Sequence, residues 1–453
     1  MNALLISTYD LGRPPFGVAS PAAWLARAGI EVRCLDLAVE PLDPDAVRAA
    51  DLIAFHLPMH TATRLAARTI PIVRALNPRA HLCGYGLYAT AGEPALRSLG
   101  VGTLIGGEFE GALVELARAL AGRDGCGGAA PAPAIQVPLE RLEFLAPRRD
   151  GLPALDRYAR LRVGSEERQA GATEASRGCR HGCRHCPIPP VYRGRFRIVP
   201  REVVLEDVRR QVRAGARHIT FGDPDFWNGI GHALPIVEAL HREHPGISYD
   251  VTIKVEHLRR HRDRLETLRD TGCAFVTSAL ESVDDAVLER LDKGHTRADA
   301  AAVVEHMRVI GLALHPTFVA FTPWITLDGY RDLLRWIAAH DLVEQVSPIQ
   351  LAIRLLLPRG SRLLELGDVA AIAGPLDPAT LVHPWRHPDP RVDRLQATLA
   401  GTIAAASGRG ERRAAIFERV ATLAGLDPGT IPAAAGDAAR RAPVPYLTEP
   451  WYC

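Results

Sequence analysis

The chain has 453 residues, 47% of them hydrophobic, which is enough apolar material for two or three globular domains. Its 54 basic and 52 acidic residues give a net charge of +2, which offers no case for bulk attraction to nucleic acid or to a membrane. Three of the cysteines are clustered, the N-terminus is unlike a secretion signal, and the sequence has no long apolar run. These features predict a soluble cytoplasmic protein.

Residues 1–125 alternate short apolar runs with helical patterns, which is typical of a parallel sheet covered on both faces. Five such units predict a flavodoxin-like, doubly wound sheet, whose ligands bind beyond the carboxyl ends of the strands. The expected strands are Ala3–Ser7, Glu31–Leu37, Leu52–Leu57, His81–Tyr85 and Thr103–Ile105. Polar residues and glycines near those ends are candidate ligand contacts: Ser7, Thr8, His56, Gly84, Gly86, Gly106, Gly107 and Glu108.

Two features of this segment have competing interpretations. Gly84-x-Gly86-x-x-Ala89 has the spacing of a dinucleotide-binding fingerprint, but it follows the fourth strand, whereas that fingerprint belongs to the first strand–helix turn. We therefore expect an ordinary turn there. His56, at the end of the third strand, is expected to be a hydrogen-bonded structural residue, with metal ligation as the alternative.

A glycine- and proline-rich stretch opens residues 126–171, which we expect to be a linker and transitional segment. From residue 172 the strand–helix alternation restarts with a longer period. Six strands are expected, at Ala172–Ser176, His218–Gly222, Tyr249–Val255, Ala274–Leu280, Leu314–Phe321 and Val346–Leu356. Parallel barrels place their chemistry at the carboxyl ends of such strands.

Cys179, Cys183 and Cys186 follow the first of these strands with the spacing C-x3-C-x2-C. Thiolates crowded in this way favour zinc or an iron–sulfur cluster. Three cysteines can hold three corners of a 4Fe–4S cluster, which normally takes four, and would leave one iron open to a small molecule. The alternative is a structural zinc site with His181 or His185 as fourth ligand, although zinc usually joins two ligand pairs from separate turns.

This loop, with Ala-Thr-Glu-Ala-Ser-Arg-Gly before Cys179 and Pro-Ile-Pro-Pro after Cys186, resembles the cobalamin-associated branch of the radical S-adenosylmethionine (radical SAM) superfamily. The resemblance implies that residues 172–363 form a partial (β/α)6 barrel that holds a 4Fe–4S cluster and S-adenosylmethionine (SAM). It also implies SAM contacts from residues after strands two, three and four, although Ala279 replaces a glycine of the family's Gly-x-Glu-Ser motif. Those residues are Gly222, Asp223, Lys254, Glu256, Glu281 and Ser282.

Residues 1–125 are similar to the cobalamin-binding domain that precedes many radical SAM domains, in the segments Pro15–Leu37, Cys83–Thr90 and Leu104–Ala117. The family's cobalt-ligating histidine motif would follow the first strand, but Tyr9–Arg13 contains no histidine. The resemblance therefore implies cobalamin bound without that lower ligand. The alternative is a sheet of the same fold that has no cofactor.

The cysteine loop is also rich in arginine, with Arg177, Arg180, Arg184, Arg193, Arg195 and Arg197. Three interpretations stay open: a docking face for an acidic electron donor such as a flavodoxin or ferredoxin, recognition of an anionic substrate, or compensation of the cluster's negative charge. An arginine cluster alone is insufficient to argue for RNA.

Residues 364–453 are expected to form a mainly helical region with an aromatic-rich tail that ends at Cys453. The tail resembles a radical SAM group with a CUAEP/CCAEP tail, in which the chain continues past this cysteine with Cys-Ala-Glu-Pro or with selenocysteine in place of that second cysteine. One expectation is that the sequence stops where a selenocysteine codon was read as termination. Truncation and a genuine end are the alternatives.

These features predict a radical SAM enzyme that acts on an unknown small-molecule or peptide substrate, with cobalamin-dependent methyl transfer as the leading option. The rival hypothesis is a non-catalytic protein, either an iron–sulfur and cobalamin sensor or a zinc-stabilised binding module. The residues leave the substrate, the electron donor and the oligomeric state open.

Overall fold

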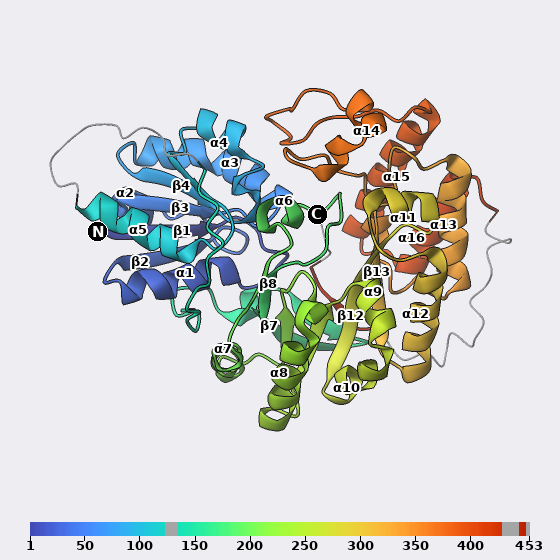
Figure 1. The fold of residues 1–453 in the computed structure, drawn as a ribbon, viewed down its shortest axis with the longest axis horizontal. Coiled ribbons are helices and arrows are strands. Elements are labelled where there is room, and N and C mark those ends of the chain that lie inside the picture. The colour runs from blue at the N-terminus through green and yellow to red at the C-terminus, as the bar shows by residue number, and fades with distance from the viewer. Residues whose placement is uncertain (123–134, 428–443, 450–453) are drawn as a thin grey trace.

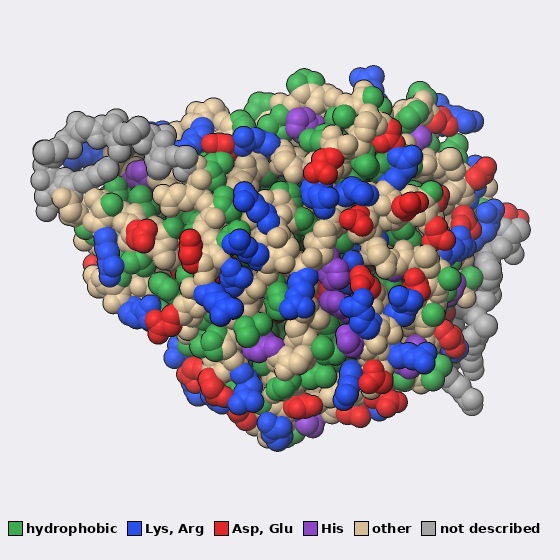
Figure 2. Space-filling model, viewed as in Figure 1, with side chains coloured by type: hydrophobic (Ala, Val, Ile, Leu, Met, Phe, Trp, Pro, Cys, Tyr) green, Lys and Arg blue, Asp and Glu red, His purple; other side chains and the backbone are tan. Residues whose placement is uncertain are grey.

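The computed structural model describes residues 1–122, 135–427 and 444–449. Figure 1 shows two sheets, one in the blue N-terminal half and one in the green and yellow part of the chain, each with helices packed against it. Basic and acidic side chains are interspersed over the face drawn in Figure 2, in keeping with the net charge of +2. Within the described ranges, no helix is long and apolar enough to cross a membrane.

The N-terminal sheet is parallel, with the strand order β2-β1-β3-β4-β5. Its strands are β1 Asn2–Ser7, β2 Glu31–Asp36, β3 Leu52–His56, β4 His81–Tyr85 and β5 Thr103–Ile105. Between and after them lie helices α1 Phe16–Arg27, α2 Pro44–Ala49, α3 His60–Leu76, α4 Glu93–Ser98 and α5 Glu110–Ala121. The predicted doubly wound sheet is confirmed, and its order switches direction between β1 and β3, which is where ligands bind in such folds.

Successive residues of β1 pack on opposite faces of this sheet, as strand geometry requires. Leu4 and Ile6 belong to an apolar cluster with residues of α2, α3 and α4, whereas Ala3 and Leu5 belong to a second cluster with α1 and α5. Because helices cover both faces, the carboxyl ends of the strands are the places left for ligands.

The second sheet has the order β13-β12-β11-β10-β7-β6-β14, in which the first five strands named are parallel and β6 and β14 are antiparallel. The strands are β6 Arg160–Val163, β7 Glu166–Thr173, β10 His218–Phe221, β11 Ser248–Thr252, β12 Cys273–Glu281, β13 Ala313–Phe318 and β14 Tyr446–Leu447. The helices are α7 Arg201–Arg213, α8 Ile230–Glu243, α9 Val255–Arg260, α10 Leu265–Asp270, α11 Asp285–Leu291, α12 Arg297–Ile310 and α13 Leu327–Ala339.

The first barrel strand is displaced from its predicted position. β7 begins at Glu166 rather than at Ala172, because it is the second strand of a hairpin with β6. After Thr173 the chain leaves the sheet and forms a separate strand, β8 Ser176–Gly178, which pairs with β9 Phe196–Ile198. The cysteine loop and the short helix α6, Ile188–Tyr192, lie between β8 and β9.

The sixth predicted barrel strand, at 346–356, is replaced by a 3-10 helix at Pro348–Leu351. Pro348 has no N–H to give to a strand ladder, and the side chain of Gln350 accepts the Phe318 N–H at 3.0 Å in place of a strand carbonyl. Where the sixth strand was expected, only a single parallel bridge forms, between Phe321 and Arg354. The partial barrel therefore has five full parallel strands among the described residues.

The predicted helical C-terminal region is present as α14 Gly367–Ile372, α15 Pro390–Gly408 and α16 Arg413–Leu423. The tail departs from it, because β14 pairs with β6 at the edge of the second sheet. Beyond β14 the tail reaches the N-terminal half, where the Tyr9 hydroxyl donates to Glu449 at 3.2 Å. Cys126 and Cys453, with the hypothesis about termination at Cys453, lie outside the described residues.

Candidate active site

The carboxyl ends of the two sheets face each other across a cavity of about 500 Å³. On the N-terminal side its wall includes the loop after β1, the end of β3 and the turn after β4, with Arg13, His56 and Gly86. On the other side the wall includes barrel strands and the cysteine loop, with Thr252 and Cys186. The structure thus brings both sets of predicted ligand-binding ends to one space.

The three cysteines lie on a loop that depends on a glycine turn. Gly178 has a φ of +75°, and a Cβ there would lie 2.5 Å from the Arg195 carbonyl oxygen, so other residues are excluded. Cys183 is buried, and the Cys186 N–H donates to the Cys183 carbonyl at 3.3 Å. All three thiols are free of disulfide bonds.

Burial makes these thiolates costly without a metal. It raises the pKa of Cys179, and it raises the pKa of Cys186 to about 12, with the nearby Cys183 thiol adding to both shifts. Buried thiolates on one loop need a compensating positive charge, which a metal ion or an iron–sulfur cluster supplies. The donor set therefore fits a cluster held by three cysteines.

Glu281, at the end of β12, lines the cavity and anchors the cysteine loop. Its carboxylate lies 3.1 Å from His185 Nε2 and 3.6 Å from Lys293 Nζ. Burial acts to raise the pKa of Glu281, but Lys293 and His185 outweigh it and lower the pKa to about 2. The φ of Glu281 is +68°, which is uncommon for a residue with a side chain. The structure thus gives this predicted SAM residue a loop-holding contact.

Gly222 and Asp223, at the end of β10, also line the cavity. The Gly222 N–H donates to the Thr173 carbonyl at 2.7 Å. The Asp223 carboxylate accepts the Ala175 N–H at 2.9 Å and the Ser176 hydroxyl at 2.5 Å. Burial is the main cause that raises the pKa of Asp223 to about 7. This carboxyl group therefore braces the chain that leads into the cysteine loop.

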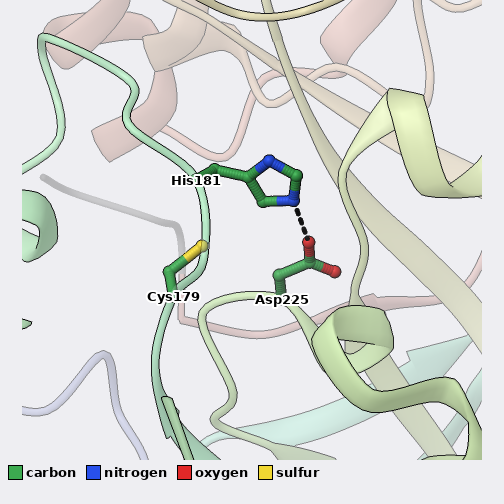
Figure 3. Close-up of side chains that lie close together, drawn as sticks. All are labelled: Cys179, His181 and Asp225. Atoms are coloured by element: carbon green, nitrogen blue, oxygen red, sulfur yellow. Dashed lines mark ion pairs between the residues drawn. The ribbon is translucent and has the colours of Figure 1, made fainter. Parts of the chain in front are cut away.

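Lys254, Glu256 and Ser282 are not among the residues that line the cavity. Lys254 Nζ lies 3.1 Å from His181 Nδ1 and 3.3 Å from Glu256 Oε2, so this pair contacts the cysteine loop from another side. His181 itself points toward Asp225 (Figure 3). Ser282 lines a separate polar pocket of about 280 Å³. Contacts from these three residues to SAM stay predictions.

At the N-terminal edge, His56, Gly86 and Gly107 line the cavity. Gly86 and Gly107 have φ values of +111° and +65°, so both turns favour glycine. The remaining candidates for cobalamin contact are absent from the wall: Ser7, Thr8, Gly84, Gly106 and Glu108. Gly84 packs instead against the side chains of Leu57 and Leu104, which a Cβ would meet at 2.9 and 3.0 Å.

His56 differs from the expected hydrogen-bonded residue, because its Nδ1 is buried without a partner among the described residues. Its ring lies beside Tyr85 and Phe109, with centroid distances of 5.4 and 6.0 Å. Burial lowers its pKa to about 3, so the imidazole is neutral. Gly17 makes room for it, since a Cβ there would lie 2.0 Å from His56 Nε2.

Arg177 was grouped with the loop arginines in the sequence, but it is buried, with 6% exposure. It joins the part of the chain that holds the N-terminal sheet to the part that holds the barrel. It donates to Glu110 of α5 at 2.9 Å and to Glu174 at 2.9 Å, and it lies 3.3 Å from Glu108. Its guanidinium also lies 5.2 Å from the ring centroid of Phe109. Arg177 therefore neutralises buried carboxylates and is not part of a docking face, whereas Arg180, Arg193 and Arg195 are exposed.

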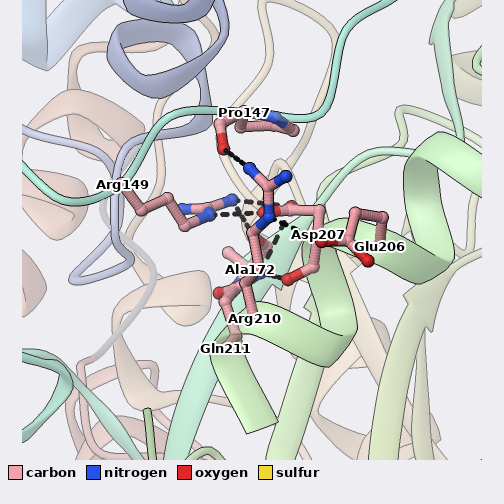
Figure 4. A network of polar contacts seen from close by, with 7 residues as sticks. All are labelled: Pro147, Arg149, Ala172, Glu206, Asp207, Arg210 and Gln211. Carbon is pink, nitrogen blue, oxygen red and sulfur yellow. Dashed lines mark hydrogen bonds and ion pairs between the residues drawn. The ribbon is translucent and has the colours of Figure 1, made fainter. Parts of the chain in front are cut away.

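Arg149, in the segment between the sheets, makes a second buried junction (Figure 4). Its guanidinium donates to both carboxylate oxygens of Asp207 in α7, at 2.6 and 2.9 Å, and to the Ala172 carbonyl at 2.6 Å. Gln211 of the same helix accepts the Ala172 N–H at 2.9 Å. Bidentate pairs of this kind are strong and also fix the relative orientation of the two side chains. This pair holds the end of β7 in place just before the cysteine loop.

Sequence reasoning missed several cavity residues. Thr252, Thr277 and Thr317, from β11, β12 and β13, line the cavity, as do Asp10 and Arg13 of the loop after β1. Burial is the largest cause that raises the pKa of Asp10 to about 7. The threonines follow the polar–apolar alternation of their strands, which was available as a signal. Asp10 and Arg13 carried no motif.

A sequence profile of the radical SAM superfamily matches residues 173–337. These residues form a radical SAM domain. Among curated proteins, the ribosomal protein uS12 methylthiotransferase RimO of Parabacteroides distasonis is 26% identical over 195 residues, 39% of this chain and 43% of that protein. The chain thus spans less than half of that relative. Hopanoid C-3 methylase of Methylococcus capsulatus is 24% identical over 365 residues, 76% of this chain and 68% of that protein.

The solved structure of the radical SAM methyltransferase TsrM from Kitasatospora setae, with cobalamin and a [4Fe-4S] cluster bound, superposes with a TM-score of 0.66. It is 16% identical and covers 93% of this chain and 99% of that chain. At that identity the likeness shows the fold alone: a doubly wound parallel sheet followed by a partial barrel.

Proposed function

We propose that this protein is a radical SAM enzyme in which Cys179, Cys183 and Cys186 hold a 4Fe–4S cluster. When bound, the cluster supplies the electron that cleaves SAM and starts radical chemistry, and cobalamin would carry a methyl group. The observation that carries the proposal is the three-cysteine loop at the carboxyl end of β7, with Cys186 in the wall of the cavity.

The barrel edge supports SAM binding beside that loop. Gly222 lets a ligand approach the backbone, since a Cβ there would have its nearest neighbours at 3.6 Å. The carboxyl group of Asp223 is an acceptor suited to an ammonium group, and Thr252 and Thr277 offer hydroxyl groups to the same space. Polar groups placed in this way orient a ligand, while the largely apolar wall excludes water.

A role for cobalamin is supported by the N-terminal edge and by the fold. The glycine turns at Gly86 and Gly107 form part of this wall, and Phe16 and Phe109 add apolar surface to it. Neither the loop Tyr9–Arg13 nor the rest of the β1–α1 connection contains a histidine, so the lower ligand would not come from there. We propose methyl transfer to a carbon of a substrate held between the two edges.

An acidic electron donor, such as a flavodoxin or ferredoxin, is the partner that the exposed loop arginines support. Arg193 and Arg195 are exposed at the turn between α6 and β9, and Ile198 next to them is 49% exposed. Reversing both arginine charges should weaken the enzyme's use of the protein donor while leaving cleavage driven by dithionite unchanged. An equal loss with both reductants would reject this docking face.

Anaerobic reconstitution tests the proposed activity. The wild-type protein should bind the cluster and form 5′-deoxyadenosine from SAM and a reductant, and Cys183→Ala should reduce product to background. Cys273→Ala is the matched control, because Cys273 is a buried thiol in the apolar core and should keep both cluster and product. A colourless protein that makes no 5′-deoxyadenosine would favour the non-catalytic alternative.

A further inference from the structure

Four side chains of metal-binding types lie close together beside the cysteine loop: Cys179, His181, Asp225 and His257. The sulfur of Cys179, a ring nitrogen of His181 and a carboxylate oxygen of Asp225 lie within 4.8 Å of one another (Figure 3). Asp225 Oδ2 also lies 3.5 Å from His181 Nε2 and 2.9 Å from His257 Nδ1. None of the four residues lines the cavity.

The facing atoms of this group are largely buried and lack well-oriented hydrogen bonds. Asp225 is 2% exposed and His257 7% exposed. Asp225 Oδ2, His257 Nδ1 and His181 Nε2 have no hydrogen-bond partner with acceptable geometry among the described residues, although they lie close together. Asp225 Oδ1 is used separately, since it accepts the Trp227 N–H at 3.2 Å. Buried polar atoms are normally hydrogen-bonded. Here the Asp225 carboxylate oxygen is held only by ion-pair contacts to the two imidazoles, an arrangement of donors that a shared cation would also satisfy.

The donor chemistry selects the cation. One thiolate and one carboxylate carry two negative charges, which a divalent ion balances, and two neutral imidazoles complete four donors. Sulfur, nitrogen and oxygen in this mixture suit tetrahedral zinc.

We propose that the cluster-free chain binds one zinc ion through Cys179, His181, Asp225 and His257. A Zn–S bond forms as the S–H bond of Cys179 breaks and its proton passes to solvent, and no electron is transferred. This site uses one cysteine, unlike a zinc knuckle built on all three. Because Cys179 is common to both sets, zinc and the cluster compete for it; this competition rests on the proposed function, whereas zinc binding does not.

Zinc titration of the full, cluster-free chain against a chromogenic chelator tests the site. We expect one zinc per chain, with affinity lowered about 100-fold or more in Asp225→Asn and His257→Ala. Asp225→Asn preserves the side-chain volume and the oxygen that accepts the Trp227 N–H. Cys183→Ala and Cys186→Ala should keep the wild-type affinity. His261→Ala is the matched control, because its ring lies 6.3 Å from that of His257 but outside the donor group.

Cobalt(II) provides a spectroscopic probe of the same site, and its charge-transfer band should report one thiolate and disappear in Cys179→Ser. The proposal is overturned if the wild-type chain binds no zinc, or if zinc is lost with Cys183 or Cys186 and retained in Asp225→Asn. On zinc-loaded protein, the cluster should assemble only after a chelator has removed the zinc. Assembly with zinc still bound would show that zinc and the cluster do not share Cys179. Zinc binding without any cluster formation would reject the proposed function and leave the zinc site standing.

Discussion

The two edges that enclose the cavity differ in how they handle charge. At the N-terminal edge, burial holds side chains toward their neutral forms, since it lowers the pKa of His56 to about 3 and raises that of Asp10 to about 7. At the barrel edge, burial also raises the pKa of Asp223 to about 7, but Glu281 keeps its charge because partners compensate it. Burial acts to raise the pKa of Glu281, yet Lys293 and His185 lower it to about 2.

This difference separates the tasks of the two halves. An edge of neutral side chains and glycine turns suits the broad surface of a large cofactor, whereas an edge of compensated charges suits a metal cluster and a small charged ligand. Arg177 contacts charged groups from both parts of the molecule. It neutralises Glu108 and Glu110 from the N-terminal half together with Glu174 from the barrel half.

Replacing Arg177 should have the largest effect on the stability of the protein. Arg177→Met leaves the buried carboxylates of Glu108 and Glu110 and the partly buried Glu174 without their cation. We expect the free energy of unfolding to fall by about 3–5 kcal/mol at pH 8. Urea unfolding at that pH measures the loss. Because burial raises the pKa of Glu108 to about 7, part of the loss should disappear at pH 5, where this carboxyl group is protonated.

Arg180→Met is the matched control in the same loop. Arg180 is exposed and lies 4.5 Å from the ring centroid of Phe196, so its removal should cost less than about 1 kcal/mol. Similar losses for the two variants would show that Arg177 is not a junction between the halves.

Crowding the neutral edge should have a smaller effect. In Gly17→Ala the new Cβ would overlap the ring of His56, and we expect a loss of about 1–3 kcal/mol in unfolding free energy, measured by urea denaturation. Gly231→Ala in α8 is the control, because a Cβ there meets no atom within 4 Å. That variant should be more stable than the wild type by about 0.5–1 kcal/mol, since alanine favours helix. A harmless Gly17→Ala would contradict the close packing of His56.

The pH dependence of stability sharpens the comparison through a small change at each pH unit. The folded-state pKa of Asp223 is raised from 3.8 to about 7, so between those values the native protein holds a proton that the unfolded chain has released. Stability from this group is therefore present below pH 4 and is lost as the pH rises toward 7, on the order of 1 kcal/mol per pH unit. Asp223→Asn removes this titrating group. The unfolding free energy of the variant should therefore increase relative to that of the wild type as the pH rises from about 4 to 7.

Urea unfolding of both proteins at several pH values between 4 and 8 measures that difference. The readout is the gap between the two curves, because Asp10 and Glu108 titrate in the same range in both proteins. Parallel curves would mean that the carboxyl group of Asp223 is ionised in the folded protein at neutral pH.

The sequence by itself determined the order of strands and helices, the three-cysteine loop and the placement of Gly222 and Asp223 at a strand end. These features depend on short-range information: periodic burial along one segment, and spacing within one loop. The same reasoning failed at 346–356, where apolar residues suggested a strand. There the side chain of Gln350 caps β13, a contact across 32 residues that no local pattern contains.

Tertiary structure alone decided which strand-end residues face the cavity and which are already paired. Glu281 and Lys254 had equal standing in the sequence, yet Glu281 lines the cavity and Lys254 contacts His181 instead. Arg177 met carboxylates 67 and 69 positions away rather than solvent. A charged group at a strand end takes the partner that a distant segment brings to it, because desolvation penalises any buried charge left alone, and that partner is known only once the sheets have packed.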